Sequence, residues 1–284
     1  MYLTFGPNME YHVQAYLSML SFYKQMTKED RIVMVTNMPQ YYKYAEKWAD
    51  IIAIDNQQIK EWEGPHHYRF RIKTMAMKQQ VENHPNEHLL FVDTDTFLYG
   101  KLNDIRDIMN QNNTIMHKDE GHPSKMKSAS LRMWHTVSSK TLAGVTLGMQ
   151  HNMWNSGIIG IPAQLTQEII NHTISLLDAM LDIGVKSFNV EQYALSVAMI
   201  EHSTIKEATS YVAHYWGNKQ EWKAITYELI AKAHMKQLSL KEELAQIDIS
   251  ELRTHPIYVH QSSTGKRLKE LINNLFKDKG HKYI

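Results

Sequence analysis

Short runs of β-branched and aromatic residues alternate with longer stretches of helical periodicity along most of this 284-residue chain. Such alternation is typical of α/β proteins, in which helices flank a mostly parallel sheet. The expected strands lie at 2–5, 31–36, 51–54, 88–92, 114–117, 157–161 and 211–214. The expected helices lie at 11–25, 40–48, 68–81, 162–183, 191–200 and 222–232. The pattern therefore predicts an α/β fold.

Residues 119–151 interrupt this alternation, because they are rich in Ser, Gly, Thr and Lys and show no clear period. Loops of this length inside a compact domain are commonly lids, binding loops or disordered segments. Two interpretations stay open: a mobile cover that orders over a ligand, and a plain surface excursion.

The composition excludes several classes of protein. Lys and Arg number 31 against 30 Asp and Glu, so the chain lacks the basic excess of a nucleic-acid binder. The absence of cysteine excludes disulfide scaffolds, thiolate zinc sites and cysteine nucleophiles. The first residues do not resemble a signal peptide, and no apolar stretch approaches the roughly 18–20 residues of a membrane span. We therefore expect a cytoplasmic protein.

The most informative segment is an apolar run over 89–92 that ends abruptly in two carboxylates, Asp93 and Asp95. Ligands of open α/β sheets bind at the carboxyl ends of the strands, so this pair is expected at a binding edge. Neighbouring carboxylates repel each other unless a cation joins them, and their oxygens suit Mg²⁺ or Mn²⁺. Such an ion can bridge a diphosphate and neutralise it as a leaving group. The alternative is that both aspartates only cap the next turn.

A haloacid dehalogenase-type phosphatase also carries an Asp-x-Asp motif after an apolar strand. That class has Thr or Val two residues after the second aspartate, where this chain has Phe97. It also places the motif near the start of the chain and needs a later Gly-Asp and Asp cluster, which this sequence lacks. The phosphatase interpretation is therefore disfavoured.

Other motifs accompany the aspartate pair in a fixed order. They are Tyr2-Leu3-Thr4-Phe5, Tyr68-Arg69-Phe70-Arg71-Ile72-Lys73, Asp93-Thr94-Asp95, Trp154-Asn155-Ser156-Gly157, Val190-Glu191-Gln192 and His214-Tyr215-Trp216-Gly217-Asn218-Lys219. With these motifs the chain resembles the GT-A fold glycosyltransferases from Met1 to about Trp222. Within them it is most similar to family 8, which includes glycogenin and the bacterial lipopolysaccharide galactosyl- and glucosyltransferases.

The resemblance implies a Rossmann-like, mostly parallel sheet and a metal-dependent transfer of a hexose from a nucleotide-diphosphate sugar, most simply a UDP-sugar. The acceptor is expected to be a glycan or a lipid-linked glycan, and the family favours retention of configuration. Mn²⁺ or Mg²⁺ is the expected cofactor. The implied metal ligands are Asp93, Asp95 and His214. The implied donor-binding residues are Thr4, Phe5, Arg69, Arg71, Asp93, Thr94, Asn155, Ser156, Gly157, Gly217 and Lys219.

Two features depart from the family pattern. The late motif is one residue shorter between Gly217 and Lys219, and the Pro-Trp that usually follows is replaced by Gln220-Glu221-Trp222. The arginine-bearing helix lies further before the aspartates than in the family, so the sequence does not distinguish Arg69 from Arg71.

The residues themselves leave alternatives open. A neutral imidazole such as His214 is a normal third ligand beside two carboxylates, although a lone histidine is more often structural. Lys219 can act as a point charge on a phosphate or be an ordinary surface lysine. Asn155 and Gly157 suit a close approach to a sugar, but Asn-Ser-Gly is also good turn chemistry.

Glu191 and Gln192 begin an expected helix and are the candidate catalytic residues. An acidic residue at this position is favoured by the helix dipole without any catalytic role. In an inverting enzyme Glu191 could be the general base. In a retaining enzyme Glu191 or Gln192 would face the sugar ring and support an oxocarbenium-like transition state.

We expect a GT-A domain over 1–235 and a helical C-terminal extension over 236–284. Residues 266–282 have apolar positions on one helical face and six basic against two acidic side chains. Such a helix can lie on the inner face of an anionic membrane or dock on the domain.

Two other functions are alternatives to a glycosyltransferase. One is a catalytically silent GT-A-like module that binds a nucleotide or a glycan. The other is a pyrophosphorylase, which needs a Gly-rich loop with Arg after the first strand; Phe5-Gly6-Pro7-Asn8 does not supply one.

Overall fold

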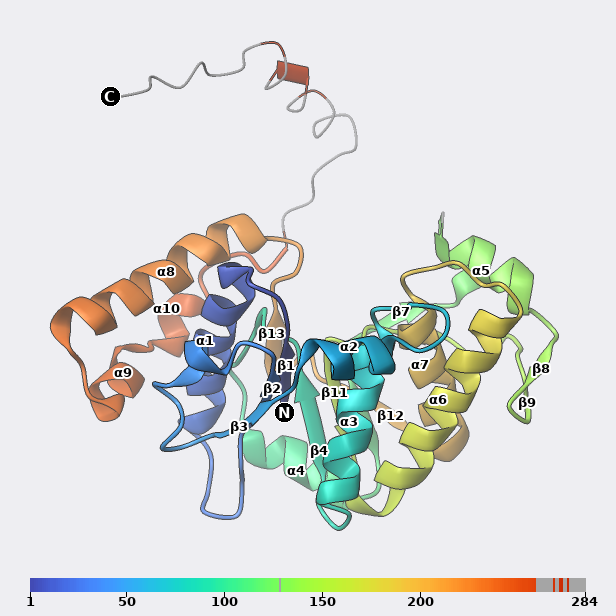
Figure 1. The fold of residues 1–284 in the computed structure, drawn as a ribbon, viewed down its shortest axis with the longest axis horizontal. Coiled ribbons are helices and arrows are strands. Elements are labelled where there is room, and N and C mark those ends of the chain that lie inside the picture. Colours follow the sequence, from blue (N-terminus) through green and yellow to red (C-terminus); the bar gives the residue numbers. More distant parts are fainter. Residues whose placement is uncertain (128, 259–267, 269–270, 273–274, 276–284) are drawn as a thin grey trace.

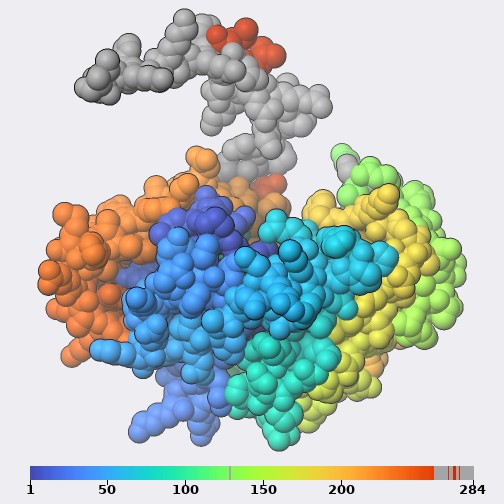
Figure 2. All heavy atoms as spheres, viewed as in Figure 1, coloured from blue at the N-terminus to red at the C-terminus, as the bar shows by residue number. Residues whose placement is uncertain are grey.

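The structure, a computed structural model, describes residues 1–127, 129–258, 268, 271–272 and 275 (Figure 1, Figure 2). Strands and helices alternate over most of the described chain, which confirms the predicted α/β class. All seven expected strands are present within a few residues of their predicted bounds.

The central sheet has two hydrogen-bonded parts. Strands β1 (Tyr2–Thr4), β2 (Val33–Thr36) and β3 (Asp50–Ala53) pair in parallel in the order β1-β2-β3. Strands β4 (Leu89–Val92), β6 (Thr114–Met116), β11 (Ile158–Ile161) and β12 (Ile205–Glu207) follow the order β12-β6-β11-β4, with β11 antiparallel to both neighbours.

Met1 joins the two parts. Its amino nitrogen donates to the Leu90 carbonyl at 2.7 Å, and its carbonyl accepts from the Val92 amide at 3.1 Å. This pattern extends the parallel pairing from β1 to β4. The carboxyl ends of β1, β2 and β4 therefore meet at one edge of a mostly parallel sheet, as the sequence predicted.

Both faces of the sheet are covered. Successive side chains of a strand point to opposite faces. Phe91 and Ile159 accordingly lie in one apolar cluster with the helices α3 (Arg71–Asn83), α6 (Thr166–Asp182) and α7 (Val190–His202). Val92 and Ile158 lie in another, with α1 (Met9–Tyr23) and α4 (Leu102–Asn110). The near-continuous apolar character of the central strands follows from this two-sided burial.

The expected strand at 211–214 forms as β13 (Val212–His214), but it lies outside the central sheet. It pairs antiparallel with β5 (Thr96–Leu98), the strand directly after the aspartate pair, with His214 opposite Thr96. This two-stranded ribbon carries His214 back to the end of β4.

The helix predicted over 40–48 is wrong. The chain there forms a 3₁₀ turn, Pro39–Tyr42, followed by bonds from the Ala45 amide to the Tyr42 carbonyl and from the Trp48 amide to the Ala45 carbonyl. Tyr42 and Ala45 are both buried, and a three-residue spacing suits a 3₁₀ turn as well as an α-helix. The sequence also missed the short helices α2 (Asn56–Glu63) and α4.

Residues 119–151 contain regular structure, so the prediction of a long loop is wrong. They form β7 (Asp119–Gly121), α5 (Ala129–Val137) and a hairpin of β8 (Thr141–Leu142) and β9 (Val145–Thr146); β7 pairs with β10 (Met153–Trp154). These elements are too short to show a period in the sequence. Five apolar side chains of this segment are buried in the cluster shared with α6 and α7: Met133, Val137, Leu142, Val145 and Leu147.

After α8 (Lys219–Lys236) come α9 (Leu240–Gln246) and α10 (Ile249–Leu252), and Ile247 and Leu252 pack in one cluster with Leu17 of α1. The helix predicted over 266–282 lies mostly outside the described residues. Four of its apolar positions are described, and all are exposed: Leu268, Leu271, Ile272 and Leu275. Among helices in the described ranges, none has the length and apolarity to cross a bilayer.

Candidate functional site

The site lies where β4 ends and the chain turns into β5. The Asp93 amide donates to the Gly157 carbonyl at 2.8 Å, and the Tyr215 amide donates to the Asp95 carbonyl at 3.0 Å. Inside the turn, the Thr96 hydroxyl donates to the Asp93 carbonyl at 2.7 Å. Neighbouring strands thus hold the turn from both sides, which fixes the directions of its two carboxylates.

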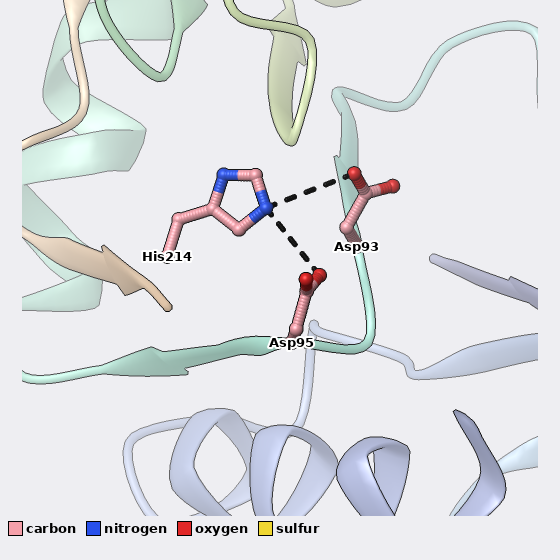
Figure 3. A group of neighbouring side chains, drawn as sticks. All are labelled: Asp93, Asp95 and His214. Carbon is pink, nitrogen blue, oxygen red and sulfur yellow. Dashed lines mark ion pairs between the residues drawn. The ribbon is translucent and has the colours of Figure 1, made fainter. Parts of the chain in front are cut away.

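Asp93, Asp95 and His214 converge on one point (Figure 3). His214 Nε2 lies 3.3 Å from Asp95 Oδ1 and 4.0 Å from Asp93 Oδ2. One ligand atom from each residue lies within 4.8 Å of the others. Two carboxylate oxygens and an imidazole nitrogen at such separations can surround one divalent ion. The sequence predicted this triad, and the fold brings it together.

Gly157 makes room for the His214 ring. A Cβ at position 157 would lie 2.2 Å from His214 Cε1 and 2.4 Å from Nδ1. No side chain fits at that distance, so the glycine is required by the imidazole that passes over it. The sequence assigned Gly157 to a close approach to the donor, whereas in the structure its immediate neighbour is His214.

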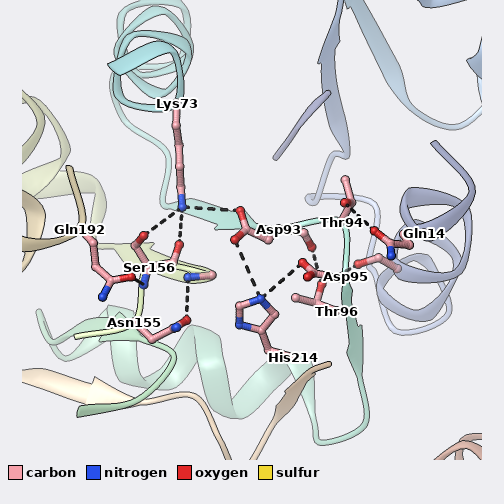
Figure 4. Close-up of polar contacts among 12 residues, drawn as sticks. Gln14, Lys73, Asp93, Thr94, Asp95, Thr96, Asn155, Ser156, Gln192 and His214 are labelled. Atoms are coloured by element: carbon pink, nitrogen blue, oxygen red, sulfur yellow. Dashed lines mark hydrogen bonds and ion pairs between the residues drawn. The ribbon is translucent and has the colours of Figure 1, made fainter. Parts of the chain in front are cut away.

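Two lysines compensate the two carboxylates, and Figure 4 shows one of them, Lys73, beside Asp93. Lys219 Nζ lies 2.8 Å from Asp95 Oδ2, and Lys73 Nζ, on α3, lies 3.5 Å from Asp93 Oδ1. Burial by itself would raise the pKa of Asp95, but its hydrogen bond to His214 and the Lys219 ammonium outweigh burial and hold the pKa well below its usual range. Asp95 is therefore ionised and available to a cation at neutral pH.

On the other side of Asp93, polar groups of three elements meet around Ser156. Lys73 donates to the Ser156 carbonyl at 2.5 Å, and the Ser156 hydroxyl donates to Glu191 Oε2 at 3.3 Å. The Ser156 amide donates to Gln192 Oε1 at 3.4 Å, and the Gly157 amide donates to Asn155 Oδ1 at 3.1 Å. The predicted sugar-side residues are thus adjacent to one another.

Glu120 of β7 orients two of these side chains. It accepts a hydrogen bond from Asn155 Nδ2 at 3.0 Å and one from Gln192 Nε2 at 2.9 Å. Both amides therefore use their carbonyl oxygens on the backbone and one amide hydrogen each on the same carboxylate.

Glu191 is a buried acid beside the site. Its pKa is raised, chiefly by burial and also by Asp93, although the Lys73 ammonium acts in the opposite direction. Its Oε1 has no hydrogen-bond partner in the part of the chain that the structure describes. A buried, unpartnered carboxylate oxygen next to a cation is a feature of functional sites more than of packing.

His117, at the end of β6, supports the ring of His214. The two rings meet edge to face with centroids 5.0 Å apart. Burial lowers the pKa of His117 to about 3, and His214 and Lys118 add to the effect. His117 is therefore neutral over the physiological range and adds no positive charge to the triad.

The predicted donor-binding residues near β1 have different surroundings. The Thr4 hydroxyl is buried and bonds to Thr36 and to Tyr42, each at 3.0 Å. The Arg69 guanidinium instead lies over the Phe5 ring, 5.2 Å from its centroid. Phe5 and Arg69 thus form a pair at the end of β1, while Thr4 is engaged inside the sheet.

The structure distinguishes the two arginines that the sequence left open. Arg71 donates to both oxygens of Asp178 at 2.8 and 2.9 Å and to the Trp62 carbonyl at 3.1 Å. All of its guanidinium nitrogens are therefore engaged in joining α3 to α6 and to the end of α2. The Arg69 side chain is 69% exposed and makes one long ion-pair contact, 4.0 Å from its Nε to Glu63 Oε1, so its guanidinium is the less engaged of the two.

Three residues of the site were missed by the sequence interpretation: Lys73, Glu120 and Tyr11. Lys73 ends the run 68–73, but nothing in its spacing separates it from the two arginines of that run. Glu120 comes from the segment interpreted as a loop. Tyr11 is exposed, and its ring centroid lies 6.0 Å from Lys219 Nζ; nothing in the sequence marks it.

A cavity of about 510 Å³ lies at the other end of the sheet. It is lined by the amino-terminal parts of β1, β2 and β4, including Met1, Val33 and Leu89. Since ligands of such sheets bind at the carboxyl ends of the strands, this cavity is not the site.

No family model matches this sequence, and no curated protein matches it. Among solved structures, mouse xyloside xylosyltransferase 1 in its apo form is similar to this chain, with 12% identity over 72% of this chain and 83% of the other and a TM-score of 0.48. The apo structure of the bifunctional glycosyltransferase WbbM is similar over 73% of this chain and 38% of its own, with 15% identity and a TM-score of 0.44. Both TM-scores lie below 0.5, so neither likeness assigns a function to this chain.

Proposed function

We propose that this chain is a metal-dependent glycosyltransferase of the GT-A type that transfers a hexose from a nucleotide-diphosphate sugar. The observation that carries the proposal is the convergence of Asp93, Asp95 and His214 at the carboxyl end of β4, flanked by Lys73 and Lys219. A divalent ion beside two ammonium groups is suited to a diphosphate leaving group.

The three residues fit a divalent cation. Their ligand atoms already face one another, and it is Nε2 of His214 that points towards the carboxylates. The other ring nitrogen, Nδ1, is buried and has no partner among the described residues. Oxygen and imidazole ligands suit Mn²⁺ or Mg²⁺. When bound, the ion would supply positive charge to the diphosphate as it departs.

The lysines would exchange partners on donor binding. In the free protein Lys219 pairs with Asp95 and Lys73 lies near Asp93. With a cation on the carboxylates, both ammonium groups become available to phosphate oxygens. The exposed ring of Tyr11 beside Lys219 and the Phe5–Arg69 pair then offer apolar faces for the nucleoside, for which uridine is the expected base.

The reacting sugar would lie on the Lys73 side of the aspartates. Asn155, Ser156, Glu191 and Gln192 supply donors and acceptors there for its hydroxyl groups. Because Glu191 is buried and one of its oxygens has no partner among the described residues, it can face positive charge that develops at the reacting carbon. We propose retention of configuration, a glycan or lipid-linked acceptor and membership of family 8 as the finer form of this function.

Calorimetry with UDP, followed by a donor-hydrolysis assay over common nucleotide sugars, tests the proposal. UDP should bind in Mn²⁺ and lose affinity in EDTA. Asp95→Asn should weaken UDP binding in Mn²⁺ by about 10- to 100-fold while the fold is kept, because it removes one charged ligand. The exposed Asp107→Asn on α4 is the matched control and should have no effect.

Equal UDP affinity with and without EDTA would contradict the metal site. Metal-dependent UDP binding without hydrolysis of any donor would instead favour the catalytically silent module.

A further inference from the structure

Two exposed aromatic side chains, Trp216 and Tyr258, lie next to the site and have no part in the function proposed above. Trp216 is 49% exposed and Tyr258 is 53% exposed. Their ring centroids are 5.5 Å apart and the ring planes are inclined by 59°. Large aromatic groups left in solvent side by side are a common mark of a binding surface.

The course of the chain after β13 puts Trp216 in a turn between two residues of the site. The Tyr215 amide still pairs with the Asp95 carbonyl, so the ribbon continues one residue beyond His214. Tyr215 is fully buried and its ring stacks on Trp222, in the core. The Asn218 amide donates to the Tyr215 carbonyl at 2.9 Å, so the chain turns at Trp216. Trp216 therefore stands in the turn between His214 and Lys219, and both of these residues contact Asp95.

Tyr258 is fixed in place by the loop that carries the site. It pairs with Gly217, where an added Cβ would lie 2.1 Å from Tyr258 Cδ2. The Pro256 carbonyl, two residues earlier, accepts hydrogen bonds from Asn218 Nδ2 at 2.7 Å and from Trp222 Nε1 at 3.0 Å. The two rings therefore form a surface that exists before any ligand arrives, so that little conformational entropy is lost on binding.

The shape and chemistry of this surface suit a sugar ring. A pyranose presents an apolar C–H face to an aromatic ring while its hydroxyl edge stays in water, and Trp and Tyr combine an apolar body with a polar tip. The nucleobase of the donor already has an exposed ring at Tyr11, beside Lys219. We propose that Trp216 and Tyr258 form the platform on which a sugar ring of the acceptor stacks. This inference rests on the proposed glycosyltransferase function.

The test uses the full chain saturated with UDP and Mn²⁺, and methyl glycosides of glucose, galactose, mannose and xylose as probes. Saturation-transfer NMR should show contact to the C–H face of at least one glycoside, with the strongest transfer from aromatic protons. Trp216→Ala should lower the affinity for that glycoside by about 10-fold, the usual effect of removing a stacking ring. Trp216→Phe should restore most of the affinity. Tyr258→Ala should weaken it to a smaller extent.

Tyr227→Ala is the matched control, since Tyr227 is an exposed tyrosine on α8 that lies over Lys223 and not at the site. Circular dichroism checks that each variant is folded. In an assay with donor and the bound glycoside, the ratio of glycosyl transfer to donor hydrolysis should fall in Trp216→Ala and stay unchanged in Tyr227→Ala.

The outcomes separate the two proposals. If the wild-type chain binds no UDP in Mn²⁺, the proposed function is wrong. If UDP binds but no glycoside does, or if Trp216→Ala changes glycoside binding no more than Tyr227→Ala, only the platform is wrong. If Trp216→Ala lowers the affinities for UDP and for the glycoside by the same factor, the surface binds the nucleotide and the inference is overturned.

Discussion

At the scale of single residues, Gly157 shows how a backbone position can control a side chain far away in the sequence. The His214 ring occupies the space that a Cβ at 157 would need. We expect Gly157→Ala to displace the imidazole from Asp95. The affinity for Mn²⁺ should then fall by about 10- to 100-fold, the usual effect of disturbing the support of a metal ligand. Calorimetry with Mn²⁺ measures this directly.

Gly148→Ala is its control, because the added carbon there meets the movable end of the Gln150 side chain. Unchanged Mn²⁺ affinity in folded Gly157→Ala would mean that His214 does not hold the metal.

Glu191 gives a prediction on pH at the same scale. Its pKa in the folded chain is raised above its usual value of 4.5, chiefly by burial. Because the pKa of Glu191 is higher in the folded chain than in the unfolded chain, its contribution to the free energy of unfolding is fully present below about pH 4.5. That contribution is lost as the pH rises through the pKa of the folded chain. Glu191→Gln lacks this loss, so its stability advantage over the wild type should be absent at low pH and grow towards neutrality.

Urea unfolding between acid and neutral pH measures that difference, with the exposed Glu46→Gln as control. An advantage of Glu191→Gln that does not change with pH would show that the carboxyl titrates normally.

At the scale of elements, the segment over 119–151 is part of the core and not a detached cover. Met133 of α5 is 2% exposed and packs with side chains of α6 and α7. We expect Met133→Ala to lower the free energy of unfolding by about 2–5 kcal/mol, since it removes buried apolar volume. Met149→Ala, at a side chain that is 61% exposed, should change it by less than about 0.5 kcal/mol.

Urea denaturation of the two methionine variants measures this contrast. If Met133→Ala were as stable as Met149→Ala, α5 would contribute little to the core. The earlier expectation of a cover that orders on donor binding would then be the better description of the segment.

At the scale of the whole molecule, the open question is whether the chain meets its acceptor at a membrane surface. Residues 266–282 carry six basic and two acidic side chains, and each basic residue near an anionic surface contributes about 1 kcal/mol at low salt. We expect the full chain to sediment with phosphatidylglycerol vesicles and to be released as salt rises.

A chain ending at Tyr258 should lose this sedimentation and keep UDP binding. Vesicles of phosphatidylcholine serve as the neutral control. Equal sedimentation with neutral and anionic vesicles, or loss of folding in the shortened chain, would contradict a role for this segment at membranes.

The sequence by itself determined the α/β class and the position of the aspartate pair. Both depend on local signals: the periodicities of strand and helix, and an apolar run that ends in Asp93 and Asp95. The prediction of His214 as their partner needed the family resemblance, because its position beside them results from pairing between β13 and β5.

Only the tertiary structure decided which polar side chains share the site. Lys73 and Glu120 reach it because α3 and β7 pack at the same sheet edge, a relation between segments that no local pattern contains. Arg71 instead bonds to Asp178 and so joins α3 to α6. Because Arg69 and Arg71 are only two residues apart, the sequence does not reveal which of the two arginines makes this bond. The short elements within 119–151 were missed for the same reason: their stability comes from burial against α6 and α7, and propensity over so few residues does not specify them.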